Sequence, residues 1–362
     1  MPRYRETFIR LAHYYGAMLI KADKLYIKGG EDLRNGLLLF DQNWEQIQST
    51  WSWAVTHQKD DPVAAQFCHD FPNAGTYILA LRLHPTDRIQ WLEQGLAAAR
   101  RFNDKRIQAA YAAGLGNAYE SLGQTNKAIM FYETALRIFR KLQDRQEESL
   151  VLNNLGIAYA CLGETTRAIR YYQKSLCICR EPKNHFTEPN KLVNLGLAYQ
   201  DLGKMKLALK YFHKAIEICD ETGNQKSKGR ALGNLGNVYY LLGHLQKAIE
   251  YHQQALFISR QLGDRRSEGH DLGNLGNIYA TLGDFENAIL CYQEHLQLAR
   301  QLQDRRSEAG VSFNLSLIHF ERGEVEKACR LAKTALEIYQ DIDDPNAERV
   351  KMKLKDWQTT QL

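Results

Sequence analysis

Apolar residues along this chain follow helical spacing, and glycines interrupt the pattern at regular intervals. Leu235 and Tyr239 are four residues apart, which places them on one face of a helix. After Gly243, the segment LQKAIEYHQQALFISRQL (245–262) again carries apolar residues at helical spacing. Glycine adopts the left-handed conformation of a helix end at little cost. The pattern therefore predicts one helix that ends at Gly243 and a second helix over 245–262, with Asp264 as the N-cap of the next helix.

This pair of predicted helices recurs every forty residues, six times without an insertion. The first-helix blocks are GLGNAY (114–119), NLGIAY (154–159), NLGLAY (194–199), NLGNVY (234–239), NLGNIY (274–279) and NLSLIH (314–319). Each block is followed at fixed spacing by a glycine and then an alanine, at positions 123, 163, 203, 243, 283 and 323 and positions 128, 168, 208, 248, 288 and 328. One helical hairpin cannot bury its apolar face alone, whereas stacked hairpins can. The sequence predicts an all-α fold built as an α-solenoid.

The Leu-Gly-x-x-Tyr pattern of the first helix and the alanine of the second resemble the tetratricopeptide repeat. The forty-residue copies are similar to the repeats of kinesin light chains and Pins-type polarity adaptors. This resemblance implies a right-handed superhelix of antiparallel helix pairs, with six repeats over residues 107–344. It also implies a concave groove lined by the first helices.

The segments outside the repeats are predicted to cap the array. Residues 1–60 are expected to form two helices, over 4–27 and 32–57, and Trp44, Ile47 and Trp51 share one face of the second. Residues 345–362 are expected to form a C-terminal capping helix, in which Val350, Leu354 and Trp357 share a face. Solenoids need polar-faced terminal caps to cover their open ends.

Between the N-terminal cap and the first clear copy, residues 61–106 are interpreted as a degenerate helix pair. WLEQGLAAARRFNDK (91–105) aligns with FYETALRIFRKLQDR (131–145), which predicts a second helix over 87–104. Its partner is expected over 75–83, bounded by Pro72 and Pro85, because proline restricts helix continuation.

One junction, EPKNHFTEP (181–189), departs from the repeat and contains two prolines. Pro182 is expected to end a second helix, and Pro189 can begin the next helix in its first turn. Either this is a local loop variant or it forms a bend or contact loop in the superhelix.

Composition and charge favour a soluble cytoplasmic protein without a membrane or nucleic-acid partner. The net charge of +5 is spread along the chain, with no run of Lys or Arg that would neutralise a row of phosphates. No apolar run approaches the roughly 20 residues that span a bilayer. The seven cysteines lie in predicted helices, which suits reduced thiols that pack as small hydrophobic side chains (Cys68, Cys161, Cys177, Cys179, Cys219, Cys291 and Cys329).

No motif for catalysis, a cofactor or a metal is present, so a non-enzymatic function is expected. The chain lacks the phosphate-binding G-x-x-x-x-G-K-[ST] loop, H-E-x-x-H and G-x-S-x-G. Cys177 and Cys179 are two residues apart in a predicted helix and point to different sides. His252 and His319 occupy positions that hold Tyr or Phe in sister copies, which indicates aromatic substitutes within the packing.

A column of asparagines carries the candidate binding chemistry. Asparagine is a mediocre helix former, yet it recurs immediately before the leucine of five first helices. An Asn amide both donates and accepts hydrogen bonds, and in the tetratricopeptide family this position faces the groove and contacts extended peptides. Alternatively, these asparagines bridge adjacent helices within the array. The candidate peptide-binding residues are Asn154, Asn190, Asn194, Arg230, Asn234, Asn237, His270, Asn274, Asn277 and Asn314.

Two signalling contexts fit an interaction module of this kind. RLAHYYGAMLIKA (10–22), NWEQIQSTWSWAV (43–55) and RIQWLEQGLAAARR (88–101) look like the segment that leads into the repeats of bacterial signal-transduction ATPases with numerous domains. That resemblance implies a ligand-sensing part of a signalling system. The alternative is a stand-alone regulator that resembles Rap proteins and responds to a signalling peptide. An oligomer is possible but not indicated.

Overall fold

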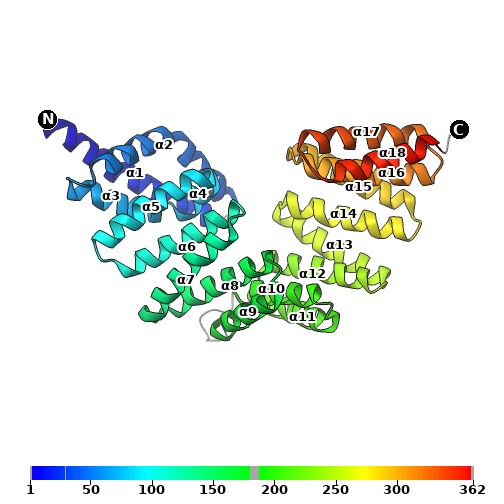
Figure 1. The fold of residues 1–362 in the computed structure, drawn as a ribbon, viewed down its shortest axis with the longest axis horizontal. Helices are drawn as coiled ribbons and strands as arrows, with labels where there is room; N and C mark the ends of the chain where they lie inside the picture. The colour runs from blue at the N-terminus through cyan, green and yellow to red at the C-terminus, as the bar shows by residue number, and fades with distance from the viewer. Residues whose placement is uncertain (1, 29, 180–186, 360–362) are drawn as a thin grey trace. The chain divides into compact units, whose positions relative to one another are not determined.

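A computed structural model describes residues 2–28, 30–179 and 187–359 of the chain, and within these ranges the regular structure is helical. The chain forms two compact units, residues 1–181 and 182–362. Within each unit the helices follow one another in chain order as antiparallel pairs (Figure 1). The boundary between the units falls at the irregular junction, and Pro182 lies outside the described residues.

Unit 1 contains a helical N-terminal part and the first two repeats. Its helices are α1 (Pro2–Lys28), α2 (Gly30–His57), α3 (Pro62–Ala74), α4 (Thr76–Arg82), α5 (Pro85–Arg101), α6 (Lys105–Ser121), α7 (Thr125–Leu142), α8 (Arg145–Cys161) and α9 (Thr165–Cys179). The predicted helices over 4–27 and 32–57 are confirmed as α1 and α2. The pairs α6/α7 and α8/α9 are the first and second repeats.

Unit 2 contains the other four repeats and a final helix. Its helices are α10 (Glu188–Asp201), α11 (Met205–Thr222), α12 (Gln225–Leu241), α13 (Leu245–Leu262), α14 (Arg265–Thr281), α15 (Phe285–Gln301), α16 (Arg305–Glu321), α17 (Val325–Asp341) and α18 (Asn346–Thr359). Pro189 lies in the first turn of α10, as predicted.

The repeat hairpins owe their geometry to glycines of two kinds. The six glycines between first and second helices all have positive φ, from 70° to 79°, which confirms their expected role as helix ends. A second glycine, such as Gly116, lies inside the first helix where a Cβ would come within 2.4 Å of the Tyr132 ring. The aromatic ring of the second helix thus packs directly on the backbone of the first. Asp264 accepts a hydrogen bond from the amide of Ser267 at 3.2 Å and is the predicted N-cap.

Stacked aromatic rings pack the N-terminal helices of unit 1 against α5. Trp51 stacks on Trp91 with ring centroids 4.2 Å apart, and Trp44 stacks on Trp91 at 6.0 Å. Ile47 and Trp51 are buried in the same core, as their shared helix face predicted. These rings join α2 to α5, so the N-terminal helices and the repeats share continuous packing within the unit.

The degenerate segment 61–106 differs from the predicted helix pair because it contains three helices. The second helix predicted over 87–104 is confirmed as α5, but its main neighbours are α3 and α6, and α4 contacts it only slightly. Pro72 lies inside α3 and does not bound it. The chain breaks instead at Gly75, where a Cβ would come within 2.5 Å of Leu19. Asp23 satisfies the start of α4 by accepting from the amides of Tyr77 and Ile78, at 2.8 Å each.

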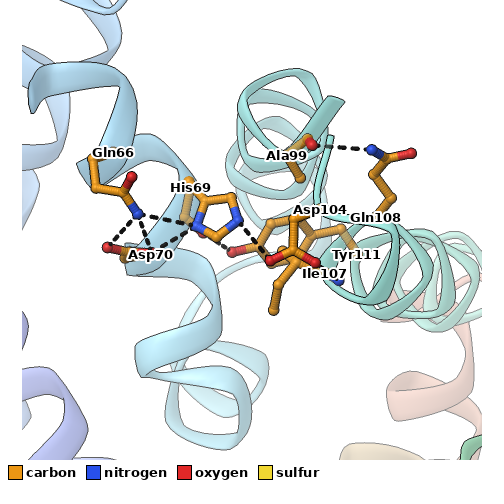
Figure 2. Close-up of polar contacts among 8 residues, drawn as sticks. All are labelled: Gln66, His69, Asp70, Ala99, Asp104, Ile107, Gln108 and Tyr111. Carbon is orange, nitrogen blue, oxygen red and sulfur yellow. Dashed lines mark hydrogen bonds and ion pairs between the residues drawn. The ribbon is translucent and has the colours of Figure 1, made fainter. Parts of the chain in front are cut away.

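A polar joint holds α3 against the start of α6 (Figure 2). The His69 ring lies between two carboxylates, with Nδ1 2.6 Å from Asp70 and Nε2 3.4 Å from Asp104. Asp104 also caps α6 by accepting from its backbone. The Tyr111 hydroxyl donates to the backbone carbonyl of His69. Because Tyr111 is buried, this bond ties the first repeat to α3.

At the other end of the chain, α18 covers the last repeat of unit 2. Val350, Leu354 and Trp357 are buried together, which confirms their predicted shared face. The Trp357 ring stacks on Phe320 with centroids 4.6 Å apart. This helix therefore supplies the apolar surface that a further repeat would otherwise provide.

Candidate binding groove

The first helices of the fourth and fifth repeats, α12 and α14, line a cavity of about 330 Å³ in unit 2. Five of the sequence-predicted residues line this one cavity: Arg230, Asn234, Asn237, His270 and Asn274. Aliphatic side chains of Leu197, Ile258 and Leu262 complete its wall. A cavity of this size and mixed lining is typical of small recognition sites, which span about 300–1,000 Å³.

Three asparagines of this cavity have amides that are available to a ligand. Asn234, Asn237 and Asn274 are half-buried, and the described part of unit 2 gives them no side-chain hydrogen bond. Arg230 extends into the same space and donates to Asn190 Oδ1 at 3.1 Å. The surrounding walls exclude part of its water, which lowers the pKa of its guanidinium. The cavity thus presents amide donors and acceptors beside a cation that has a neutral partner.

Asparagines in other repeats are engaged within the array. In unit 1, Asn154 Nδ2 donates to Asn117 Oδ1 at 3.1 Å, and the Tyr132 hydroxyl lies 2.7 Å from the same oxygen. We call a tyrosine and two asparagines connected in this way an amide relay. It links the second helix of one repeat to both first helices. Asn154 therefore bridges neighbouring repeats, as the alternative interpretation of the asparagine column proposed.

A second amide relay occurs near the end of unit 2. Asn314 Nδ2 donates to Asn277 Oδ1 at 3.3 Å, and the Tyr292 hydroxyl donates to the same oxygen at 2.6 Å. Asn190 is also engaged, since it accepts from Ser227 Oγ at 3.0 Å as well as from Arg230. The structure does not bring Asn154, Asn277 and Asn314 into the α12/α14 cavity. Asn194, half-buried in α10, has interactions within the chain and is outside that cavity's lining.

Histidine at position 252 explains why the fourth repeat lacks an amide relay. His252 replaces the relay tyrosine and is fully buried, which confirms its expected place in the packing. Its shorter ring makes no described bond to Asn237, and its Nδ1 lies 3.3 Å from Asp271 Oδ1 instead. Asp271 lines the cavity and is 8% exposed. Burial raises the pKa of this carboxyl, and its contact with His252 acts in the opposite direction.

Sequence reasoning missed Asp271 and the two glycines that open the cavity. A Cβ at Gly233 would come within 3.2 Å of Asp271 Oδ1, and a Cβ at Gly229 within 3.3 Å of Ile258. Sister repeats carry larger residues at position 233, including Val193 and Phe313. A comparison of repeat columns for size would have identified this opening, because glycine occurs there only in the fourth and fifth copies.

Other site chemistry is limited in the part of the chain that the structure describes. No group of three or more His, Cys, Asp or Glu residues within the described ranges is arranged to hold a metal ion. Within the described ranges, none of the helices combines the length and the apolar character needed to cross a bilayer. Burial raises the pKa of the Cys68 thiol to about 12 and that of Cys219 to about 11, so both thiols stay protonated and unreactive at neutral pH.

The sequence profile of the tetratricopeptide repeat matches residues 106–181, 187–261 and 270–341, which together make up more than half of the chain. The chain belongs to the tetratricopeptide repeat family. Its fold is an all-α solenoid of helix pairs, a fold that typically provides a non-catalytic module for protein interaction. No curated protein sequence matches this chain.

Solved structures of similar fold include sensor and regulator proteins. A tetratricopeptide-repeat sensor protein of the signal-transduction ATPases with numerous domains, from Pyrococcus horikoshii, is 19% identical with a TM-score of 0.64, over 93% of this chain and 51% of that one. Aspartyl phosphate phosphatase F from Bacillus subtilis is 15% identical with a TM-score of 0.63, over 92% and 94%. The Rap conjugation gene regulator of plasmid pLS20, in complex with the Phr* peptide, is 17% identical with a TM-score of 0.55, over 87% and 94%. At these identities the similarity shows the fold alone.

Proposed function

We propose that this protein binds an extended peptide segment in the α12/α14 cavity of unit 2. The observation that carries the proposal is that five sequence-predicted residues line one cavity and three of their amides, those of Asn234, Asn237 and Asn274, have no described partner. An extended peptide exposes N–H and C=O groups in alternation, which an Asn amide can meet with both its donor and its acceptor.

In this proposal the remaining asparagines support the array. The amide relays of Asn154 and Asn314 fix neighbouring repeats, and Asn190 orients the Arg230 guanidinium. Residues 107–344 are the repeats, and residues 1–60 and 345–362 are the caps that cover their ends. Arg230 and the exposed His270 stand beside the amides and meet a carboxylate of the peptide.

The signalling context follows from the kind of protein that this chain resembles. Peptide sensing by one part of a larger signalling protein is supported by the fold similarity to a sensor protein of which this chain covers 51%. A stand-alone regulator of the Rap type is supported by the fold similarity to a regulator in complex with a peptide, of which this chain covers 94%. Both contexts use the same proposed site.

The test is binding of peptides selected from a phage-displayed random library on the full chain. Asn234→Ala combined with Asn274→Ala should weaken the selected peptides roughly 10- to 100-fold, since each hydrogen bond contributes about 0.5–1.5 kcal/mol net. The melting temperature should stay nearly unchanged because these amides have no described bond to break.

The matched control changes the same residue type at the same repeat position. Asn154→Ala combined with Asn314→Ala breaks both amide relays, so it should lower the melting temperature. Neither residue lines the α12/α14 cavity, so the affinity per folded molecule should stay unchanged for the peptides that depend on Asn234 and Asn274. Fluorescence anisotropy and thermal melts of the two double variants measure both quantities. Unchanged affinity in a folded Asn234→Ala, Asn274→Ala variant would contradict the proposal.

A further inference from the structure

A second cavity, of about 410 Å³, lies in unit 1 where the repeat pattern is eroded. It is lined mainly by residues of α4, α5, α6 and α8, and it includes Asn73 and Thr76 on the two sides of the break at Gly75. This cavity contains Arg88, a residue to which neither the repeat pattern nor the asparagine column assigns a role.

Arg88 occupies the repeat position that is alanine in all six regular copies. The forty-residue register places it in line with the alanine of the second helix, which is 0% exposed in all six copies: Ala128, Ala168, Ala208, Ala248, Ala288 and Ala328. In the eroded copy, the long side chain at position 88 lines the cavity and is half-buried. In the eroded copy, a cation therefore stands at the position that holds a buried methyl group in the six regular copies.

Within the described residues, Arg88 has no ion pair and no side-chain hydrogen bond. Of the acidic side chains in and beside the cavity, Asp23 accepts from the amides at the start of α4, and Glu120 Oε2 lies 2.7 Å from the Tyr132 hydroxyl. Glu147 also lines the cavity, and the described residues give its carboxylate no ion pair with Arg88. Burial lowers the pKa of the Arg88 guanidinium, although an arginine stays charged at neutral pH. A half-buried cation without a counterion is costly, and a bound anion would offset that cost.

The rest of the cavity suits an extended chain and not an isolated ion. Its lining includes residues of α4, α6 and α8, and α6 and α8 are the first helices of successive repeats. Helices pack about 8–10 Å apart, so three of them span roughly 20 Å, the length of about six extended residues. Trp91, Leu79 and Leu150 give it apolar walls, and the relay amides of Asn117 and Asn154 line it as well.

We propose that the unit 1 cavity binds a peptide segment through an acidic side chain, whose carboxylate pairs with Arg88. The planar guanidinium can donate two parallel hydrogen bonds to one carboxylate, a geometry that lysine lacks. The site is separate from the α12/α14 cavity and does not depend on it.

The experiment uses the full chain and a phage-displayed random dodecapeptide library. Peptides are selected on the wild type after depletion on Arg88→Ala, and synthetic copies of the enriched peptides are measured by fluorescence anisotropy. These peptides should share an Asp or Glu at a fixed position, and Arg88→Ala should weaken them about 10- to 100-fold. Arg88→Lys should restore only part of this affinity. Arg100→Ala, which changes an exposed arginine of the same helix, should bind like the wild type.

The melting temperature of the Arg88→Ala variant distinguishes a role of Arg88 in peptide recognition from a role in stabilising the fold. Arg88→Ala introduces the residue of the six sister copies and removes an unpaired cation, so its melting temperature should equal or exceed that of the wild type. A fall of several degrees would overturn the proposal, as would enriched peptides that lack a fixed acidic residue. Replacing that acid by its amide should abolish the dependence on Arg88. If amidation of the peptide C-terminus abolishes the dependence on Arg88 instead, Arg88 binds the C-terminal carboxylate of the peptide. The proposal of an acidic side chain is then wrong.

A negative result for the Arg88 site can be distinguished from a negative result for the α12/α14 site of unit 2. Asn234→Ala combined with Asn274→Ala should leave the peptides that depend on Arg88 unaffected, because their cavity is built from unit 1 residues. Loss of these peptides in that double variant would contradict an independent site in unit 1.

Discussion

His252, Asp271 and Arg88 each differ from the residues that sister repeats carry at the same position. His252 occurs in place of Tyr or Phe, and Asp271 aligns with residues as different as Ala231 and Lys191. Each of these residues changes the bonding partners or the charge that its neighbours meet. His252 leaves Asn237 without a tyrosine partner, and Arg88 places a charge where the array otherwise has a methyl group. Each of the two proposed binding sites therefore contains or adjoins a residue that departs from its repeat column.

The sequence predicted the asparagine column but not which of its side chains bond to one another within the array. This bonding depends on an asparagine 37 residues earlier and on a tyrosine of the second helix between the two. Asn154 and Asn314 bond to Asn117 and Asn277, which Tyr132 and Tyr292 also contact. Asn274 makes no described bond to Asn237, the asparagine at the same offset, because His252 stands in place of the tyrosine. The pairing rule could be obtained only from the structure, because register alone does not show which side chains meet. Once the rule is known, it can be read from the sequence.

Acid should destabilise the fifth and sixth repeats through His295. Burial, and secondarily the nearby His270, lowers the pKa of this imidazole from 6.5 to about 4, and Asp304 acts in the opposite direction. Between these values the unfolded chain binds a proton that the folded chain does not. The free energy of unfolding should therefore fall as the pH is lowered from about 6.5 to 4, by at most about 2–3 kcal/mol.

Urea denaturation of the wild type and His295→Gln at pH 7, 5.5 and 4.5 measures this effect. The glutamine variant does not titrate, so its loss of stability on acidification should be smaller than that of the wild type. Parallel losses in the two proteins would show that another group carries the acid sensitivity. His270→Gln serves as a second comparison, because His270 is exposed and its charge is one of the causes that lower the pKa of His295.

At the scale of elements, sequence periodicity predicted the helices well where the forty-residue register holds. The glycine helix ends, the N-cap at Asp264 and the two capping segments all follow from local rules. Over 61–106 the helices predicted at 75–83 and 87–104 are present as α4 and α5, but the additional helix α3 was not predicted and α4 packs little on α5. The break at Gly75 depends on contact with Leu19 and on Asp23, more than fifty residues earlier. Proline was a misleading signal there, since Pro72 lies inside a helix.

Removal of the Asp23 carboxylate should destabilise the broken helix of unit 1. Asp23 accepts from two amides at the start of α4, at 2.8 Å each, and loss of a capping acceptor costs about 0.5–2 kcal/mol. Asp23→Ala should reduce the free energy of unfolding by about this amount in urea titrations. Asp23→Asn keeps an acceptor oxygen and should lose less. Equal stability of the alanine variant and the wild type would contradict a capping role.

At the scale of the whole molecule, the array is held together by contacts between neighbouring helices. In unit 2 each helix packs mainly on the one before it and the one after it, from α10 through α18. Stability in such an array is approximately a sum over repeats and their interfaces, so damage at one end should remain local. This locality lets the two proposed binding sites be tested separately in one chain.

Loss of the C-terminal cap should therefore destabilise the helices beside it first. Trp357→Ala removes a buried ring that stacks on Phe320 at 4.6 Å, a change that costs about 3–5 kcal/mol in a packed core. Amide hydrogen exchange should accelerate in α16, α17 and α18 and stay unchanged in α2 and α3, because exchange reports local opening. Met352→Ala, at an exposed position of α18, is the control and should alter neither region. Uniform acceleration over both units would show that the chain unfolds as a single cooperative body, and local damage would then reach every site.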